Sequence, residues 1–234
     1  MVETVRRHIA DGAHWNEFVV ECGGELIAPL ISRQGVQNAD YLFREQRFVV
    51  ELKELQTEFF DPLIVRIGQA AKELHENPTE EAFRKFERKL FSTLEAPLQR
   101  ILKKANRQIR ESKVEFSLED HQGLVVCIND GFIGFPPFVV TDMLNRILAR
   151  ERFSSIQGLV YLTNHAVRLA GHEDGAFLWW PYVGGETPTV VQAFADWLGD
   201  RWADYAAARL EAERAPWGSV QSLRGAKIIG SPTP

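Results

Sequence analysis

The chain has few cysteines and no long apolar run. Only Cys22 and Cys127 occur among its 234 residues, and both stand among apolar neighbours. This pattern excludes a disulfide-rich scaffold and predicts two reduced core thiols in a cytoplasmic protein, rather than a disulfide or a metal pair. A membrane-spanning helix needs about 20 consecutive apolar residues. No apolar stretch of this chain approaches that length, so we expect no membrane segment.

We also expect no signal peptide at the start of the sequence. Arg6, Arg7 and His8 stand where its apolar segment would be needed. The chain has no internal repeat and no low-complexity run, and its 45% hydrophobic and 25% charged residues are typical of a globular protein. We therefore predict one domain over residues 1–215 and a C-terminal tail over residues 216–234.

The formal net charge is −5. Proteins that bind nucleic acid are often basic, so this charge argues mildly against such a partner. An enzyme that contacts a few phosphates needs only a local basic stripe, however, and the charge does not exclude one.

Hydrophobic periodicity predicts alternating helices and strands. Residues 38–43 and 48–55 are expected to form two antiparallel strands around a four-residue loop. Thr79 should cap a helix, and Pro97 and Pro188 should open two others. A further helix is predicted over 14–31 with a break at Gly23-Gly24, and a helical segment over 57–94 with a break at Asn77-Pro78. The other predicted elements are helices over 97–111, 138–151 and 187–214, and strands over 123–128, 158–163 and 176–183. This order favours an α/β fold with a mixed central sheet flanked by helices.

The segment from Asp40 to Lys53 carries the clearest chemistry. Side chains alternate across a strand, so Glu51 and Lys53 share one face while Phe48, Val50 and Leu52 share the other. If Phe43 lies opposite Phe48, then Asp40 lies opposite Glu51 on the same face. The two carboxylates would repel each other unless a cation lies between them.

A divalent ion resolves this repulsion. Mg²⁺ prefers oxygen ligands and typically takes one or two protein carboxylates, which leaves positions for water and phosphate. We therefore predict that Asp40 and Glu51 bind Mg²⁺, with Mn²⁺ as a substitute. Lys53 would orient the attacking water or neutralise charge on the phosphate.

This constellation resembles the PD-(D/E)xK nuclease superfamily, which includes restriction endonucleases and Holliday-junction resolvases. Asp40, Glu51 and Lys53 match its motif, whereas the proline before the aspartate is replaced by Ala39. The resemblance covers about the first 130 residues. It implies a restriction endonuclease-like αβββαβ core, with a helical insertion over about 57–95 and a further C-terminal helix, and Mg²⁺-dependent phosphodiester hydrolysis.

The resemblance also implies further site residues on two helices. The family often adds an acid from the preceding helix, which would be Glu17 here, or Glu21 one turn later. It also places a helix after the motif strand, often with a Gln or Lys near the metal. On the predicted helix 97–111 this residue would be Gln108, at the border of a basic face that could follow a nucleic-acid backbone. That basic face comprises Arg100, Lys103, Lys104, Arg107 and Arg110.

Each of these patterns has a simpler reading. Glu-x-Lys is a common tripeptide, and residues 48–60 could form an amphipathic helix. Glu17, Glu21 and the basic stripe could be solvated helix faces, and Gln108 could be a surface residue outside the site. Residues 172–175 are typical of a polar turn, as are residues 129–131 after a strand. The run 179–182, which contains two tryptophans, suits core or dimer packing, or stacking on an unpaired base.

Three hypotheses follow. The first is a Mg²⁺-dependent nuclease acting on DNA, where cleavage of both strands would favour a homodimer with the aromatic C-terminal half as its interface. The second is a catalytically inactive nucleic-acid-binding or regulatory protein of the same fold. The third is an interaction module unrelated to nucleic acid, which predicts Glu51 and Lys53 on a helix.

Overall fold

A computed structural model describes residues 12–31, 35, 37–56, 61–130, 135–150, 153–165, 167–169, 172–183, 188–210 and 227–230. Its elements in chain order are α1 (Gly12–Glu21), β1 (Glu25–Leu26), the 3₁₀ helix η1 (Ala28–Leu30), β2 (Tyr41–Phe43), β3 (Phe48–Gln56), α2 (Asp61–Glu76), α3 (Glu80–Glu115), β4 (Gln122–Asp130), α4 (Pro137–Arg150), β5 (Gly158–Thr163), β6 (Val167–Leu169), β7 (His172–Val183), α5 (Pro188–Leu210) and β8 (Lys227–Gly230).

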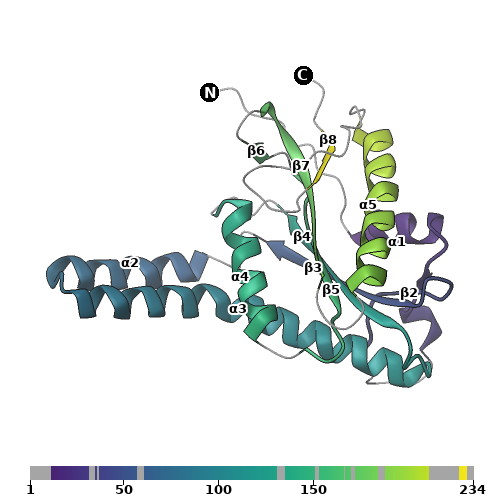
Figure 1. The fold of residues 1–234 in the computed structure, drawn as a ribbon, viewed down its shortest axis with the longest axis horizontal. Helices are drawn as coiled ribbons and strands as arrows, with labels where there is room; N and C mark the ends of the chain where they lie inside the picture. The colour runs from purple at the N-terminus through teal and green to yellow at the C-terminus, as the bar shows by residue number, and fades with distance from the viewer. Residues whose placement is uncertain are drawn as a thin grey trace.

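One mixed sheet organises the fold. Its strand order is β1-β2-β3-β4-β5-β7-β6, and β8 pairs with β7. Strands β3, β4 and β5 run parallel, whereas the other pairs are antiparallel. In Figure 1, α3 and α4 lie on one side of the sheet and α1 and α5 on the other. The predicted α/β fold with a mixed sheet flanked by helices is confirmed.

The alternation of side chains along β3 supplies two separate cores. Val49 and Leu55 pack with the buried residues of α3 and α4. Phe48 and Val50 pack with those of α1 and α5. Every central strand is therefore covered on both faces, as expected for the parallel part of a sheet.

Helix α3 differs from the prediction. Thr79 caps it as expected, because its Oγ1 accepts a hydrogen bond from the backbone N of Ala82 at 3.1 Å. Pro97, however, does not open a helix but lies inside α3. Proline removes one hydrogen bond of a helix interior, yet Leu94 and Leu98 on either side of it are buried in the core. Packing against the sheet therefore outweighs the local signal of the proline.

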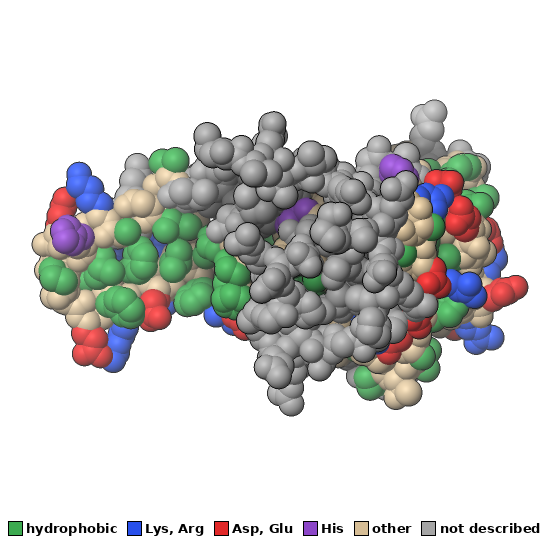
Figure 2. Space-filling view, turned by 90° about the horizontal axis from the view of Figure 1, so that it is seen from above, with side chains coloured by type: hydrophobic (Ala, Val, Ile, Leu, Met, Phe, Trp, Pro, Cys, Tyr) green, Lys and Arg blue, Asp and Glu red, His purple; other side chains and the backbone are tan. Residues whose placement is uncertain are grey.

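Helix α2 and the first half of α3 form a hairpin that extends away from the sheet (Figure 1). We call residues 61–93 the arm. It corresponds to the predicted helical insertion but continues without a break into the helix that covers the sheet. Figure 2 shows hydrophobic side chains along the arm, and Val65 and Phe83 are 64% and 51% exposed. Two helices are too few to bury a core of their own.

Other boundaries also differ from the prediction. Helix α1 ends at Glu21, and Gly23 follows with φ +79°, a value that favours glycine. The second half of the predicted helix 14–31 forms β1 and η1 instead. Residues 172–175, predicted as a turn, belong to β7, and the predicted tail contains β8.

Several predictions fall outside the described residues. These are residues 57–60 at the start of the predicted helix 57–94, Gly131 of the predicted turn, Thr187 as a helix cap and the end of the last helix beyond Leu210. Pro188 begins α5 as expected. Within the described part of the chain, no helix has the length and apolar character needed to cross a membrane.

Gly123 allows β4 to approach the loop before β5. A Cβ atom at this position would lie 1.9 Å from the carbonyl oxygen of Ser155. We expect Gly123→Ala to lower the free energy of unfolding by about 3 kcal/mol, because backbone must move to make room. The control Gly68→Ala lies in α2 with open space around it, and it should raise stability by about 0.5–1 kcal/mol. Urea unfolding of both variants tests this, and equal effects would contradict it.

Candidate functional site

The hairpin of β2 and β3 sets the position of the two acids. Phe43 pairs with Phe48 and Tyr41 with Val50, which is the register predicted from the sequence. Asp40 directly precedes β2, and its Oδ2 accepts a hydrogen bond from the backbone N of Leu52 at 2.8 Å. This register places the carboxylate of Asp40 beside that of Glu51.

Helix α3 fixes the segment that leads into Asp40. The backbone N of Ala39 donates to Ser112 Oγ at 2.8 Å, and both residues are buried. The side-chain amide of Gln108 donates to the carbonyl oxygen of Asn38 at 2.8 Å. The helix therefore holds the backbone one and two residues before the first acid.

Gln108 also contacts the predicted catalytic lysine. Lys53 Nζ donates to Gln108 Oε1 at 2.9 Å and to Glu51 Oε1. One amide side chain thus joins β3 to the segment before Asp40. The structure brings together Asp40, Glu51, Lys53 and Gln108, all on the face of the sheet covered by α3.

Glu51 lies in an electrostatically unfavourable place. Its side chain is 1% exposed, and no hydrogen-bond donor of the described residues reaches its Oε2 atom. Burial, the largest cause, and the neighbouring Asp40 together raise the pKa of Glu51 to about 8, although Lys53 acts in the opposite direction. When Glu51 is ionised, its Oε2 atom therefore has no partner among the described residues. Protonation of the carboxylate or a bound cation would remove this cost.

The donor set around this unpartnered oxygen fits Mg²⁺. Asp40 and Glu51 offer carboxylate oxygens, and this ion typically uses one or two protein carboxylates. A larger cluster is absent, since no three His, Cys, Asp or Glu side chains of the described residues gather closely enough to hold a metal. Asp40 and Glu51 are thus the two residues here that could hold the ion.

Glu17, predicted as a further catalytic acid, lies elsewhere. It is on α1 beside the core of the other sheet face, where it accepts a hydrogen bond from the Tyr205 hydroxyl at 2.9 Å and pairs with Arg209 at 2.9 Å. The Tyr205 hydrogen bond and Arg209 lower the pKa of Glu17. Glu21 also pairs with Arg209, at 3.4 Å. The structure brings neither acid to the Asp40–Glu51 pair.

The predicted basic residues line the outer side of α3. Arg100, Lys103, Lys104 and Arg107 are exposed, and Arg107 also donates to Gln37 Oε1 at 2.5 Å. Gln108 is instead turned towards the sheet, as its contact with Lys53 shows. The border position of Gln108 allowed either a surface residue or one that reaches the site, and its side chain contacts Lys53 and the backbone of Asn38.

Ser112 and Asn38 were not predicted. Ser112 occupies a position of the apolar stripe of α3, in line with Leu102, Ala105 and Ile109. A buried hydroxyl there needs a partner, and this was the available signal. The role of Asn38 depends on its backbone oxygen, for which a sequence gives no signal.

A second polar group lies at the carboxyl ends of β4 and β5. Asn129 donates to the Tyr161 hydroxyl at 2.8 Å, and Asn164 donates to Asp130 Oδ1 at 2.5 Å. Lys53 of β3 pairs with Cys127 of β4, which in turn pairs with Tyr161 of β5. These contacts satisfy polar atoms beside the core, and they do not include the acid pair.

The aromatic run of β7 is part of the interior. Trp179 and Trp180 are buried on opposite faces of the sheet. Neither is available for stacking on a base or for the predicted dimer interface.

The two cysteines lie in different cores. Burial raises their pKa values to about 11 for Cys22 and about 12 for Cys127, so both remain thiols near neutral pH.

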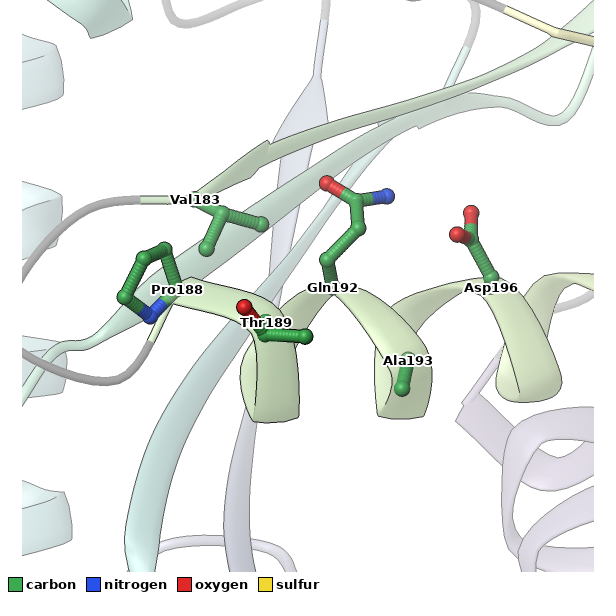
Figure 3. Close-up of a pocket in the computed structure, with 6 residues that line it drawn as sticks. All are labelled: Val183, Pro188, Thr189, Gln192, Ala193 and Asp196. Carbon is green, nitrogen blue, oxygen red and sulfur yellow. The ribbon is translucent and has the colours of Figure 1, made fainter.

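A surface hollow lies beside the first turns of α5 (Figure 3). Thr189, Gln192 and Asp196 line it, together with Val183, Pro188 and Ala193. Asp196 pairs with Lys227 of β8. The hollow is on the sheet face opposite the acid pair, and the described residues that line it carry no arrangement of acids and bases suited to catalysis.

Comparisons with protein-family models, with curated proteins and with solved structures gave no match.

Glu51 should make stability depend on pH. Its pKa is 4.5 in a model compound and about 8 in the fold, so between these values the folded state keeps a proton that the unfolded state releases. Stability should therefore fall as pH rises from about 4.5 to 8 and level off above. Glu51→Gln removes this loss and should stabilise the metal-free protein at pH 8.5 by a few kcal/mol.

Urea unfolding in EDTA at pH 5.5, 7 and 8.5 measures this effect. Glu54→Gln is the control, because it removes an exposed carboxylate from the same strand. Adding Mg²⁺ at pH 8.5 should stabilise the wild type and leave Glu51→Gln unchanged. If the unfolding free energies of the wild type and Glu51→Gln changed in parallel with pH, the pKa of Glu51 would not be raised in the fold.

Proposed function

We propose that this protein is a Mg²⁺-dependent nuclease that hydrolyses phosphodiester bonds of DNA. The proposal rests on one observation: the Asp40 and Glu51 carboxylates lie side by side on the sheet face that α3 covers, with Lys53 beside them. Two acids so placed destabilise the metal-free fold. A function that requires a cation at this point explains why they are kept together.

The order of elements supports the same assignment. Helix α1, strands β1 to β3, helix α3 and strand β4 follow one another, with α2 as an addition. This order agrees with the αβββαβ core implied by the resemblance to the PD-(D/E)xK nucleases. The third hypothesis loses support, because Glu51 and Lys53 lie on a strand and not on a helix.

Each site residue has a distinct role in the proposal. Asp40 and Glu51 would hold Mg²⁺, which when bound supplies Lewis-acid chemistry towards a phosphoryl oxygen and the attacking water. Lys53 offers a positive charge and hydrogen-bond donors to the phosphate or the water. Gln108 positions Lys53 through the 2.9 Å hydrogen bond and couples it to the segment before Asp40.

The partner of the site follows from its surroundings. Arg100, Lys103 and Lys104 are exposed on the same helix as Gln108. Cations at these positions can bind the phosphates on either side of the cleaved bond. Cleavage of both strands would need two active sites, which a symmetric dimer provides.

A cleavage assay tests the proposal. Plasmid DNA and single-stranded DNA are incubated with the protein in Mg²⁺, in Mn²⁺ or in EDTA. We expect cleavage with either metal, and a loss of at least about 100-fold for Asp40→Ala and for Lys53→Ala. Glu17→Ala is the matched control, because it removes an acid that lies on the other sheet face, and it should cleave at the wild-type rate.

The possible results separate the hypotheses. Equal cleavage by the wild type, Asp40→Ala and Lys53→Ala would reject the assigned site. Salt-sensitive DNA binding without cleavage in either metal would select a catalytically inactive binding or regulatory protein. Failure to bind DNA at any salt concentration would select a function unrelated to nucleic acid.

A further inference from the structure

Helix α3 joins the candidate site to the arm without interruption. Its 36 residues run from Glu80 in the arm to Glu115 beyond Gln108. Because the helix is continuous through Pro97, side chains on the arm are related to those near the site by the helical repeat. Residues that share one side of the whole helix can therefore contact the same ligand.

One side of α3 is basic along most of its length. At 3.6 residues per turn, the residues within about 60° of Arg107 include seven cations and one carboxylate, Glu111. The acids Glu80, Glu87 and Glu95 lie on other sides. The cations, which we call the α3 stripe, are Lys85, Lys89, Arg100, Lys103, Lys104, Arg107 and Arg110.

The α3 stripe is available to a partner. All seven side chains are exposed. For Lys85, Lys89 and Lys104, no carboxylate of the described residues lies within ion-pair distance. By contrast, Arg84, off the stripe, pairs with Glu80 at 2.5 Å. Seven exposed cations on one side of a helix, three of them without a carboxylate partner among the described residues, favour an anionic ligand in a chain of net charge −5.

The length of the stripe indicates the ligand. Lys85 and Arg110 are 25 positions apart on the helix, or about 37 Å at 1.5 Å per residue. That distance equals about 11 base pairs, close to one turn of duplex DNA. Single-strand binding surfaces use aromatic platforms for the bases. Phe86, which is half-buried, is the one aromatic residue on this side of α3.

We propose that the α3 stripe binds the sugar–phosphate backbone of duplex DNA over about one helical turn. Lys85 and Lys89 of the arm form the contact farthest from the acid pair. Lys104 lies one turn from Gln108, so a backbone that follows the stripe passes beside Lys53 and Asp40. The assignment of this ligand to the acid pair rests on the proposed nuclease function, whereas the binding surface itself does not.

Binding measured in EDTA tests the stripe without cleavage. Fluorescence anisotropy compares a duplex of about 30 base pairs with one of its single strands, at several salt concentrations. We expect the double variant Lys85→Gln/Lys89→Gln to bind the duplex about tenfold more weakly at 0.1 M salt. The slope of log K against log salt should decrease in magnitude by about 2, because each phosphate contact contributes about 0.9.

The matched control is Arg84→Gln/Arg88→Gln, which removes the same charge from the same two turns but about 100° or more around the helix. It should bind within about threefold of the wild type. Equal losses in the two double variants, stronger wild-type binding to the single strand, or no duplex binding by the wild type would each overturn the proposal. Duplex binding that depends on Lys85 and Lys89 without any cleavage would leave it standing and reject the nuclease function alone.

Discussion

The contact between the carboxylates of Asp40 and Glu51 is the constraint on which this molecule depends. Glu51 is buried, and Asp40 is held against the backbone of the next strand. Burial and like charge act in the same direction, and Lys53 compensates only part of the cost. A fold that keeps such a pair gives up stability at this point, as is common where a structure is organised for binding or catalysis.

Helix α3 is the element that makes this arrangement rigid. Ser112 and Gln108 hold the backbone before Asp40, and Gln108 also holds Lys53. The same helix supplies much of the core on this face of the sheet. The acid pair, the lysine and the basic residues outside therefore share one support.

The sequence predicted local geometry better than relations across the fold. Alternation and the pairing of Phe43 with Phe48 were enough to place Asp40 beside Glu51. Helical spacing does not say which sheet face a helix covers, and Glu17 lies on the face opposite the acid pair. The local preference of Pro97 predicts a helix start, whereas burial of Leu94 and Leu98 lets α3 continue through this residue. The predicted turn over 172–175 became strand through pairing with β6, a contact that has no local signal.

The continuity of α3 also restricts how such a protein can change its reach. Each residue inserted between the arm and Gln108 would rotate the outer part by about 100° and advance it by 1.5 Å. One or two added residues would turn Lys85 and Lys89 away from the side that carries Arg100 and Arg107. Seven or eleven residues would restore the phase, because these lengths are close to two and three full turns. The arm can thus lengthen only in steps set by the helical repeat.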